Sequence, residues 1–275
     1  MRLADKLYAV IQLWRPPLLV LGFIGALGLL RWSGISIDIV KSGLIVMTIG
    51  FANLGFNTMN ELRDVEIDRV NKPWKPLPSG RISRKFALYS SLTFIILSVI
   101  TLILLVTLFD PFYLIAIVGY FTSFVYSGLQ KRDLLGNVCL GASYSIAGLI
   151  STYPKILQMN FALAFGLFTI AYNVYVQWQD MVADRSEGIV TLPIQMGNKA
   201  IIVSIILATI SILLTAELFY LTGKLFLLLF IIATLLVVIS TYGVKKDNKK
   251  FIEWTLRRGG RFLITLAFLW MIIFA

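Results

Sequence analysis

Nine stretches of nearly continuous apolar residues run along the chain, separated by short polar or charged segments. They lie near Pro17–Leu30, Ile37–Asn60, Phe86–Leu108, Phe112–Ser127, Leu134–Thr152, Phe161–Val176, Ala200–Leu221, Leu225–Val244 and Phe262–Ala275. A helix needs about 20 residues to cross the roughly 30 Å hydrocarbon core of a bilayer. Several stretches are a little short, which leaves tilted helices or a merged pair open. The pattern predicts nine transmembrane helices.

The composition agrees with lipid as the main solvent. The 275 residues are 58% hydrophobic and only 14% charged, with a mean hydropathy of +0.85. Soluble domains are nearer a quarter charged, and a transmembrane barrel would show alternating rather than continuous apolar residues. No linker or low-complexity tract divides the chain. We therefore expect an all-α polytopic membrane protein with one domain over residues 1–275.

Basic residues predict the orientation of the bundle. The formal net charge is +11, which alone suggests nucleic acid, anionic lipid or phosphorylated substrates as partners. In membrane proteins, however, Lys and Arg concentrate in cytoplasmic loops. With nine crossings and a cytoplasmic N-terminus, the exceptions to that rule are Arg31, Lys41, Lys155 and Lys224. We expect a multi-pass protein of the cell membrane, with its C-terminus outside and no nucleic-acid partner.

Several kinds of catalytic site are excluded by composition. The chain has no histidine and a single cysteine, Cys139. An intrachain disulfide, a Cys/His metal cluster and a Ser/His/Asp or Cys/His nucleophile are therefore all ruled out. Acid–base or metal chemistry has to use carboxylates, Lys, Tyr or the backbone.

The acidic residues gather on the inner side, although Asp and Glu contribute little to membrane orientation. The exceptions are Asp38, Asp110 and Glu217. After the second apolar stretch, Asn60, Asp64 and Asp68 stand four residues apart. At about 100° per residue, their oxygens fall on one face of a helix. Their placement on the Asp-rich cytoplasmic face suggests a site.

A second segment repeats this spacing with Asp180 and Asp184, after the sixth apolar stretch. Carboxylates four residues apart repel each other in a helix, and ionisable groups are costly near a membrane. One such pair is explained as a solvated helix end balanced by nearby Lys and Arg. Two pairs at the inner ends of apolar stretches favour a functional site.

The donor types predict which cofactor binds. Asn60, Asp64, Asp68, Asp180 and Asp184 offer hard oxygen ligands, with no nitrogen or sulfur donor nearby. Mg²⁺ is typically held by a few carboxylates together with substrate phosphates. A diphosphate that bridges two Mg²⁺–carboxylate clusters gives both Asp-rich segments a role. We therefore expect Mg²⁺, with the four aspartates as the catalytic residues.

Cationic and polar side chains near these segments are candidates for binding phosphate oxygens. A loop with three prolines and a glycine, residues 71–81, carries two of them and is expected to be stiff and non-helical. For each of these lysines an ordinary inner-loop role is the alternative, and Arg15 also suits a snorkelling anchor. With the motif residue Asn60, the candidates are Arg15, Arg63, Lys72, Lys75, Tyr126, Lys131 and Arg132.

These motifs in this order resemble the UbiA superfamily of intramembrane prenyltransferases. The chain contains N-x-x-x-D-x-x-x-D from Asn60, N-K-P-W-K-P-L-P-S-G from Asn71, a Tyr…Lys-Arg loop, and D-x-x-x-D from Asp180 before T-L-P. The residues in and around these motifs are most similar to those of the archaeal digeranylgeranylglyceryl phosphate synthases, which make ether membrane lipids. Three positions depart from the family pattern, namely Glu61, Lys75 and Gln177.

The resemblance implies Mg²⁺-dependent transfer of a polyprenyl group, through an allylic carbocation, to a membrane-associated acceptor. The implied donor is geranylgeranyl diphosphate and the implied acceptor is geranylgeranylglyceryl phosphate. An aromatic acceptor, such as a quinone or porphyrin precursor, is the alternative within the family. A transporter of anionic solutes is the alternative from another class, although transporter sites are expected near the membrane midplane.

Overall fold

The computed structural model describes residues 3–14, 16–34, 38–128, 133–186, 188–245, 248–252, 255 and 259–274. Within these ranges every secondary-structure element is a helix, and there is no strand. The helices are α1 (Leu3–Leu13), α2 (Pro16–Trp32), α3 (Ile39–Arg63), α4 (Val65–Asn71), α5 (Arg84–Leu108), η1 (Pro111–Ile115), α6 (Ala116–Gly128), α7 (Leu134–Thr152), α8 (Ile156–Ser186), α9 (Leu192–Met196), α10 (Asn198–Thr222), α11 (Phe226–Lys245), α12 (Lys249–Ile252) and α13 (Arg261–Phe274). The all-α class predicted from the sequence is confirmed.

Six of these helices are long and apolar enough to cross a membrane. They lie in α3, α5, α7, α8, α10 and α11. Shorter apolar helices, Phe23–Trp32, Pro111–Ser127 and Phe262–Ile273, run beside them. The short ones coincide with the first, fourth and ninth apolar stretches. The chain is therefore a multi-pass membrane protein.

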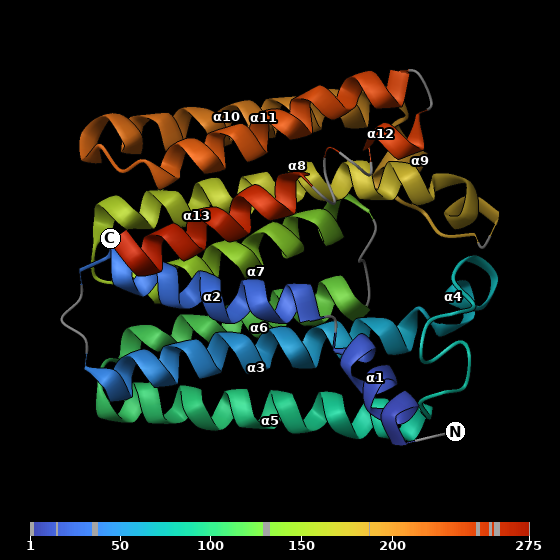
Figure 1. Ribbon diagram of the computed structural model, residues 1–275, viewed down its shortest axis with the longest axis horizontal. Coiled ribbons are helices and arrows are strands. Elements are labelled where there is room, and N and C mark those ends of the chain that lie inside the picture. The colour runs from blue at the N-terminus through green and yellow to red at the C-terminus, as the bar shows by residue number, and fades with distance from the viewer. Residues whose placement is uncertain are drawn as a thin grey trace.

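The six long helices and the shorter α2, α6 and α13 form a closed ring of packed neighbours. Going round it, α2 packs on α3, α3 on α5 and α6, α6 on α7, α7 on α8, α8 on α10, α10 on α11, α11 on α13, and α13 on α2 again. The short helices α4 and α9 project together from one end of the bundle, which we call the motif end. The opposite end, which carries the α7–α8 and α10–α11 connections, is the far end (Figure 1).

The helix ends follow from local sequence. Asp38 and Asp133 cap α3 and α7, because each side chain accepts a hydrogen bond from a backbone N–H in the first turn. Ser83 caps α5 in the same way. At the far end, α10 stops at Gly223, whose left-handed backbone (φ 62°) suits glycine.

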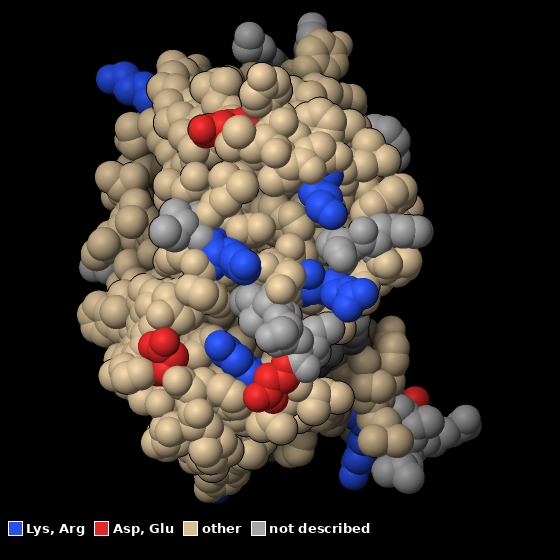
Figure 2. Space-filling view, turned by 90° about the vertical axis from the view of Figure 1, so that its left-hand side faces the viewer, with Lys and Arg blue, Asp and Glu red and all other residues tan. Residues whose placement is uncertain are grey.

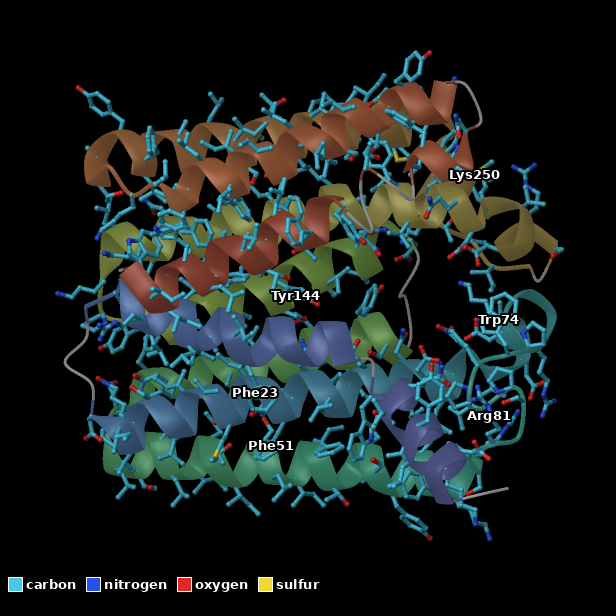
Figure 3. The ribbon with its side chains drawn as sticks, viewed as in Figure 1. Phe23, Phe51, Trp74, Arg81, Tyr144 and Lys250 are labelled. Carbon is cyan, nitrogen blue, oxygen red and sulfur yellow. The ribbon has the colours of Figure 1, made fainter. Side chains whose placement is uncertain are left out.

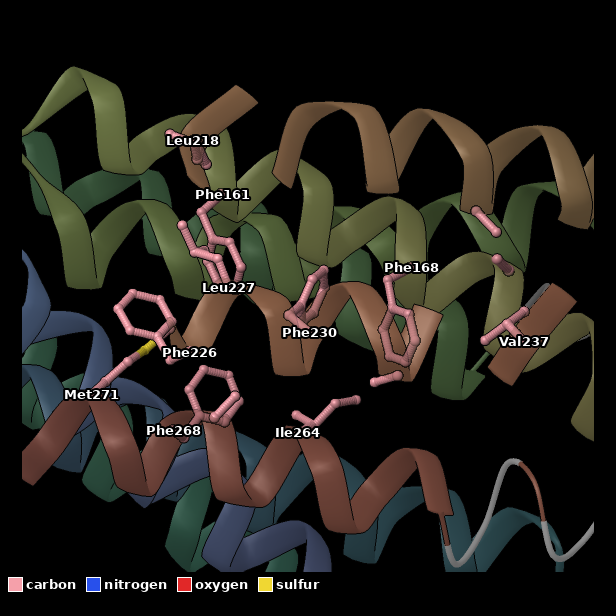
Figure 4. Packing of buried hydrophobic residues seen from close by; sticks show 14 of the residues in the cluster. Phe161, Phe168, Leu218, Phe226, Leu227, Phe230, Val237, Ile264, Phe268 and Met271 are labelled. Atoms are coloured by element: carbon pink, nitrogen blue, oxygen red, sulfur yellow. The ribbon is translucent and has the colours of Figure 1, made fainter. Parts of the chain in front are cut away.

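Glycine allows close contact between α7 and α8. A Cβ placed on Gly166 would lie 2.6 Å from the carbonyl oxygen of Gly141, so only glycine fits there at this helix separation. The fifth apolar stretch, which forms α7, is rich in Gly, Ala and Ser, and such small residues permit this close contact. Beyond α8, a largely aromatic core with Phe161, Phe230 and Phe268 joins α8, α11 and α13 (Figure 4). Both features fix α8, which carries the second Asp-rich segment.

Candidate active site

The first Asp-rich segment is bent, whereas the sequence predicts one continuous helix face. α3 ends at Arg63 and α4 begins at Val65, with Asp64 at the junction (φ −82°, ψ 0°). Backbone hydrogen bonds of helical spacing continue across it, from Asp64 N–H to Asn60 O (3.1 Å) and from Asp68 N–H to Asp64 O (2.7 Å). The four-residue spacing of the hydrogen bonds is therefore kept. The prediction of one continuous helix was wrong, because the helix is interrupted at Asp64.

Lys75 lies between two buried carboxylates. Its Nζ is 2.6 Å from Asp68 Oδ2 and 3.1 Å from Glu61 Oε2. The side chains of Glu61 and Asp68 are only 5% and 6% exposed. Burial raises the pKa of Asp68, whereas the hydrogen bond and the charge of Lys75 act to lower it. Glu61, noted in the sequence only as a departure from the family pattern, is therefore part of the site.

The proline-rich loop brings Lys75 to this position. Residues 72–83 are non-helical, as predicted. Gly80 has φ 73°, and Leu77 and Ile82 are buried against Ala9 and Leu13 of α1. The loop is thus fixed by apolar contacts on one side and directs its lysines to the carboxylates on the other.

The second Asp-rich segment continues the membrane-spanning helix without a break. Asp180 and Asp184 lie in the last turns of α8, which ends at Ser186. Asp184 is buried and Asp180 half-exposed. Lys72 Nζ lies 3.4 Å from Asp180 Oδ2, so the loop that follows the first Asp-rich segment reaches the second one at the motif end.

A cluster of neutral amides supports this end of α8. Asn137 on α7 exchanges two hydrogen bonds of 3.3 Å with Gln177 and accepts one of 2.9 Å from Asn173. Asn137 also donates to the backbone oxygen of Asp133 at 2.8 Å. Both Asn137 and Gln177 are buried. Gln177, one of the departures from the family pattern, thus has a structural contact here, which sequence reasoning missed because its partner Asn137 comes from a different helix, α7.

A cavity of about 240 Å³ opens inside the ring of helices. Helices α2, α3, α6, α7, α8 and α13 all contribute to its lining. The predicted site residues Asn60 and Tyr126 line it, and so do Tyr144, Phe165 and Phe268. Figure 3 places Tyr144 in the middle of the bundle. Asn60 belongs both to the first motif and to this cavity, which connects the charged end with an interior rich in aromatic rings.

The remaining predicted residues are placed less centrally or are not described. Arg63 is exposed in the last turn of α3. Arg15, Lys131 and Arg132 lie outside the described residues. Near Arg63, Glu66 pairs with Arg69 and Arg84 at the surface of α4 and α5, and the hydrogen bond from Arg84 lowers the pKa of Glu66. That exposed group is separate from the buried Lys75 pairs.

The charged residues at the far end are few and scattered (Figure 2). They include both signs, on a surface that is otherwise mostly uncharged. The residues that the sequence assigns to this end are Arg31, Lys41, Lys155, Lys224, Asp38, Asp110 and Glu217. The paired carboxylates and lysines described above all lie at the motif end instead.

The donor set at the motif end fits a divalent cation that binds together with a phosphate. Within the part of the chain that the structure describes, no three acidic, histidine or cysteine side chains are grouped as a ready metal site. Mg²⁺ does not require such a cage, since it commonly takes one or two carboxylates and completes its shell with water and substrate phosphates. Two carboxylate clusters with adjacent lysines suit a diphosphate and its Mg²⁺.

The whole arrangement joins an anion- and metal-binding end to an aromatic interior. A ligand that fits both has a diphosphate head and an apolar tail, as a prenyl diphosphate has. Comparison with known families agrees, because the sequence profile of the UbiA prenyltransferase family matches residues 18–272. The chain belongs to the UbiA prenyltransferase family. It is therefore a membrane prenyltransferase, as the sequence motifs predict.

Archaeal relatives narrow the position of this UbiA chain within the family. The digeranylgeranylglyceryl phosphate synthase of Thermococcus kodakarensis is 33% identical over 200 residues, 70% of each chain. That of Pyrococcus furiosus is 34% identical over 204 residues, covering 71% of this chain and 72% of the relative. The similarity to this group predicted from sequence is confirmed.

Solved structures confirm the UbiA fold over nearly the full length. One, a structure of a digeranylgeranylglyceryl phosphate synthase in membranes, is 26% identical and has a TM-score of 0.67 over 98% of this chain and 99% of that one. A UbiA homologue from Archaeoglobus fulgidus, bound to GPP and Mg²⁺, has a TM-score of 0.71 at 18% identity, over 96% of this chain and 99% of that one. The second similarity is one of fold.

Proposed function

We propose that this UbiA chain transfers a geranylgeranyl group from geranylgeranyl diphosphate to the free hydroxyl of geranylgeranylglyceryl phosphate, a step of ether-lipid synthesis. The observation that carries the proposal is the contact of Lys72 with Asp180. It brings the loop that follows the first Asp-rich segment to the second one, beside a cavity whose lining includes Asn60 of the first motif. The named archaeal relatives support the choice of donor and acceptor.

Each motif residue then has a role. Asn60, Asp64, Asp68, Asp180 and Asp184 would hold Mg²⁺, which supplies Lewis-acid stabilisation of the departing diphosphate. Lys72 and Lys75 approach the same carboxylates and would neutralise the phosphate oxygens. In the same proposal Arg15, Arg63, Tyr126, Lys131 and Arg132 bind substrate.

The reaction breaks the bond between C1 of the prenyl group and the diphosphate oxygen, and diphosphate leaves with the electron pair. The allylic cation left behind lies in a cavity lined by Tyr144, Tyr172 and Phe165. Aromatic faces stabilise cations, and exclusion of water prevents hydrolysis. A lone pair of the acceptor hydroxyl then forms the ether bond, and a proton is released.

The orientation in the membrane belongs to the same proposal. The three shorter apolar helices together with the six long ones make nine crossings of a single domain, residues 1–275. The motif end then faces the cytoplasm, where prenyl diphosphates are available, and the C-terminus lies outside. Most Lys and Arg fall on that side, as the positive-inside rule requires.

Diphosphate release by the purified protein tests the proposal. We expect release from geranylgeranyl diphosphate only when Mg²⁺ and geranylgeranylglyceryl phosphate are both present, with a two-chain ether lipid as product. Release that requires an aromatic acceptor would keep the family and overturn the substrate. Solute flux without diphosphate release would favour the transporter instead.

A further inference from the structure

One wall of the cavity is unusually polar for the interior of a membrane protein. Asn53, Asn57 and Asn60 follow one another along α3, and all three line the cavity. Asn60 lies nearest the motif end, and Asn57 and Asn53 lie about one and two turns deeper. The two deeper amides are not part of the metal motif.

One hydrogen bond joins Asn53 and Asn57, and it leaves most donors and acceptors of the two amides unused. The amide nitrogen of Asn57 donates to the amide oxygen of Asn53. A primary amide has two N–H donors and an oxygen with two lone pairs. In the described part of the chain, this bond is the one side-chain hydrogen bond recorded for either residue. The oxygen of Asn57 and the nitrogen of Asn53 therefore remain available to the cavity.

Hydroxyl groups in the same cavity behave differently. Thr48, Ser143, Ser151 and Thr169 each donate to a carbonyl oxygen four residues earlier in their own helix, at 2.7–2.9 Å. Such bonds satisfy a hydroxyl donor inside a membrane without any ligand. The two asparagines make no such hydrogen bond to the backbone of the described residues. Unpaired polar groups are costly in this environment. Their free capacity indicates a ligand with a polar group at this depth.

The cavity favours an uncharged polar group over an ionised one. None of the described residues that line it is charged. A carboxylate or phosphate would lack a counter-ion here and would remain at the motif end with Lys72 and Lys75. A hydroxyl both donates to an amide oxygen and accepts from an amide nitrogen, so it matches what Asn57 and Asn53 offer.

We propose that Asn53 and Asn57 form the acceptor subsite and bind the free hydroxyl of an aliphatic alcohol carried on a lipid. The amide oxygen of Asn57 accepts the hydroxyl proton in a hydrogen bond, and the amide nitrogen of Asn53 donates to the hydroxyl oxygen. This inference rests on the proposed function and adds the groups that select the acceptor. It places the hydroxyl next to Asn60, close to where the prenyl diphosphate is cleaved.

Acceptor kinetics of Asn57→Leu and Asn53→Leu test the subsite, since leucine keeps the approximate volume and removes the polar atoms. In each variant we expect the KM for geranylgeranylglyceryl phosphate to rise about tenfold, because one hydrogen bond to the acceptor hydroxyl is lost. The affinity for geranylgeranyl diphosphate with Mg²⁺ should change less than about twofold, because the subsite does not contact the donor's diphosphate. Asn198→Leu, on the exposed start of α10, is the matched control.

A methyl ether of the acceptor separates recognition of the hydroxyl from general damage to the cavity. In the wild type the inhibition constant of the ether should be about tenfold higher than the KM of the corresponding alcohol. In Asn57→Leu this difference should disappear. An unchanged acceptor KM, or an equal loss of donor and acceptor affinity, would overturn the subsite. If the wild type fails to prenylate the alcohol at all, the proposed function fails, and the subsite that rests on it is overturned with it.

Discussion

Lys72 Nζ lies 3.4 Å from Asp180 Oδ2, although Lys72 follows α4 and Asp180 belongs to α8. Both side chains are about one-third exposed. A pair with this exposure gains little stability from its charges, because water screens them. We therefore infer that a substrate phosphate can replace Asp180 as the partner of Lys72, and that the contact contributes little to the stability of the fold.

Replacing Lys72 by Met tests that interpretation. We expect the KM for geranylgeranyl diphosphate to rise about tenfold or more, because a charge-assisted hydrogen bond to phosphate is lost. Thermal stability should change little, since both side chains of the pair are about one-third exposed. Lys199→Met, on the exposed start of α10, is the control. A large fall in the unfolding temperature with an unchanged KM would make Lys72 a structural residue.

Asp64→Asn and Asp180→Asn test whether both Asp-rich segments hold Mg²⁺. Each change keeps the side-chain shape and removes a negative ligand, so we expect turnover to fall by about 100-fold or more. A higher Mg²⁺ requirement, measured by titrating the metal in the diphosphate-release assay, should accompany the loss. Glu66→Gln, exposed on α4, serves as control. Near-normal rates in both aspartate variants would exclude a two-segment metal site.

The apolar pattern of the sequence predicts most of the fold because membrane helices satisfy their backbone internally and need continuous apolar stretches. α3, α5, α7, α10 and α11 lie within a few residues of the predicted stretches. α8 runs about ten residues further than predicted, to Ser186. Hydropathy missed that extension, because its last turns carry mainly polar and charged residues.

Only part of the candidate site can be predicted from the sequence. The spacing of Asp64, Asp68, Asp180 and Asp184 is local and was found directly. The pairing of Glu61 with Lys75, by contrast, depends on how the proline-rich loop folds back. The contacts of Asn137 and the unsatisfied amides along α3 depend on helix packing in the same way. No periodicity or spacing encodes such contacts, so they emerge only from the three-dimensional arrangement.

Asn137→Leu tests whether the amide cluster positions the second Asp-rich segment. The change leaves Gln177 and Asn173 without their buried partner, so we expect the free energy of unfolding to fall by about 1–3 kcal/mol. Because Gln177 lies one turn before Asp180, the Mg²⁺ requirement should also rise. Both are measured on one preparation, by thermal unfolding and by metal titration of diphosphate release. Lost stability with an unchanged Mg²⁺ requirement would limit the cluster to a structural role.

The pH dependence of the reaction tests the contact between Lys75 and Asp68. Burial already raises the pKa of Asp68, and Lys75 opposes that rise. In Lys75→Met the opposing influence is removed, and the pKa of Asp68 should rise further. A protonated Asp68 cannot serve as an anionic metal ligand, and activity is lost as the pH falls through this pKa. The variant should therefore lose activity at a higher pH than the wild type does.

Lys75→Arg is the matched comparison, because it keeps the positive charge beside Asp68 and Glu61. Profiles of kcat/KM against pH, at a fixed Mg²⁺ concentration below saturation, should coincide for the wild type and Lys75→Arg on the acid side. The Lys75→Met profile should be displaced towards higher pH. Equal acid limbs in all three proteins would show that Asp68 carries no charge needed for the reaction, and the first metal cluster would then rest on Asn60 and Asp64.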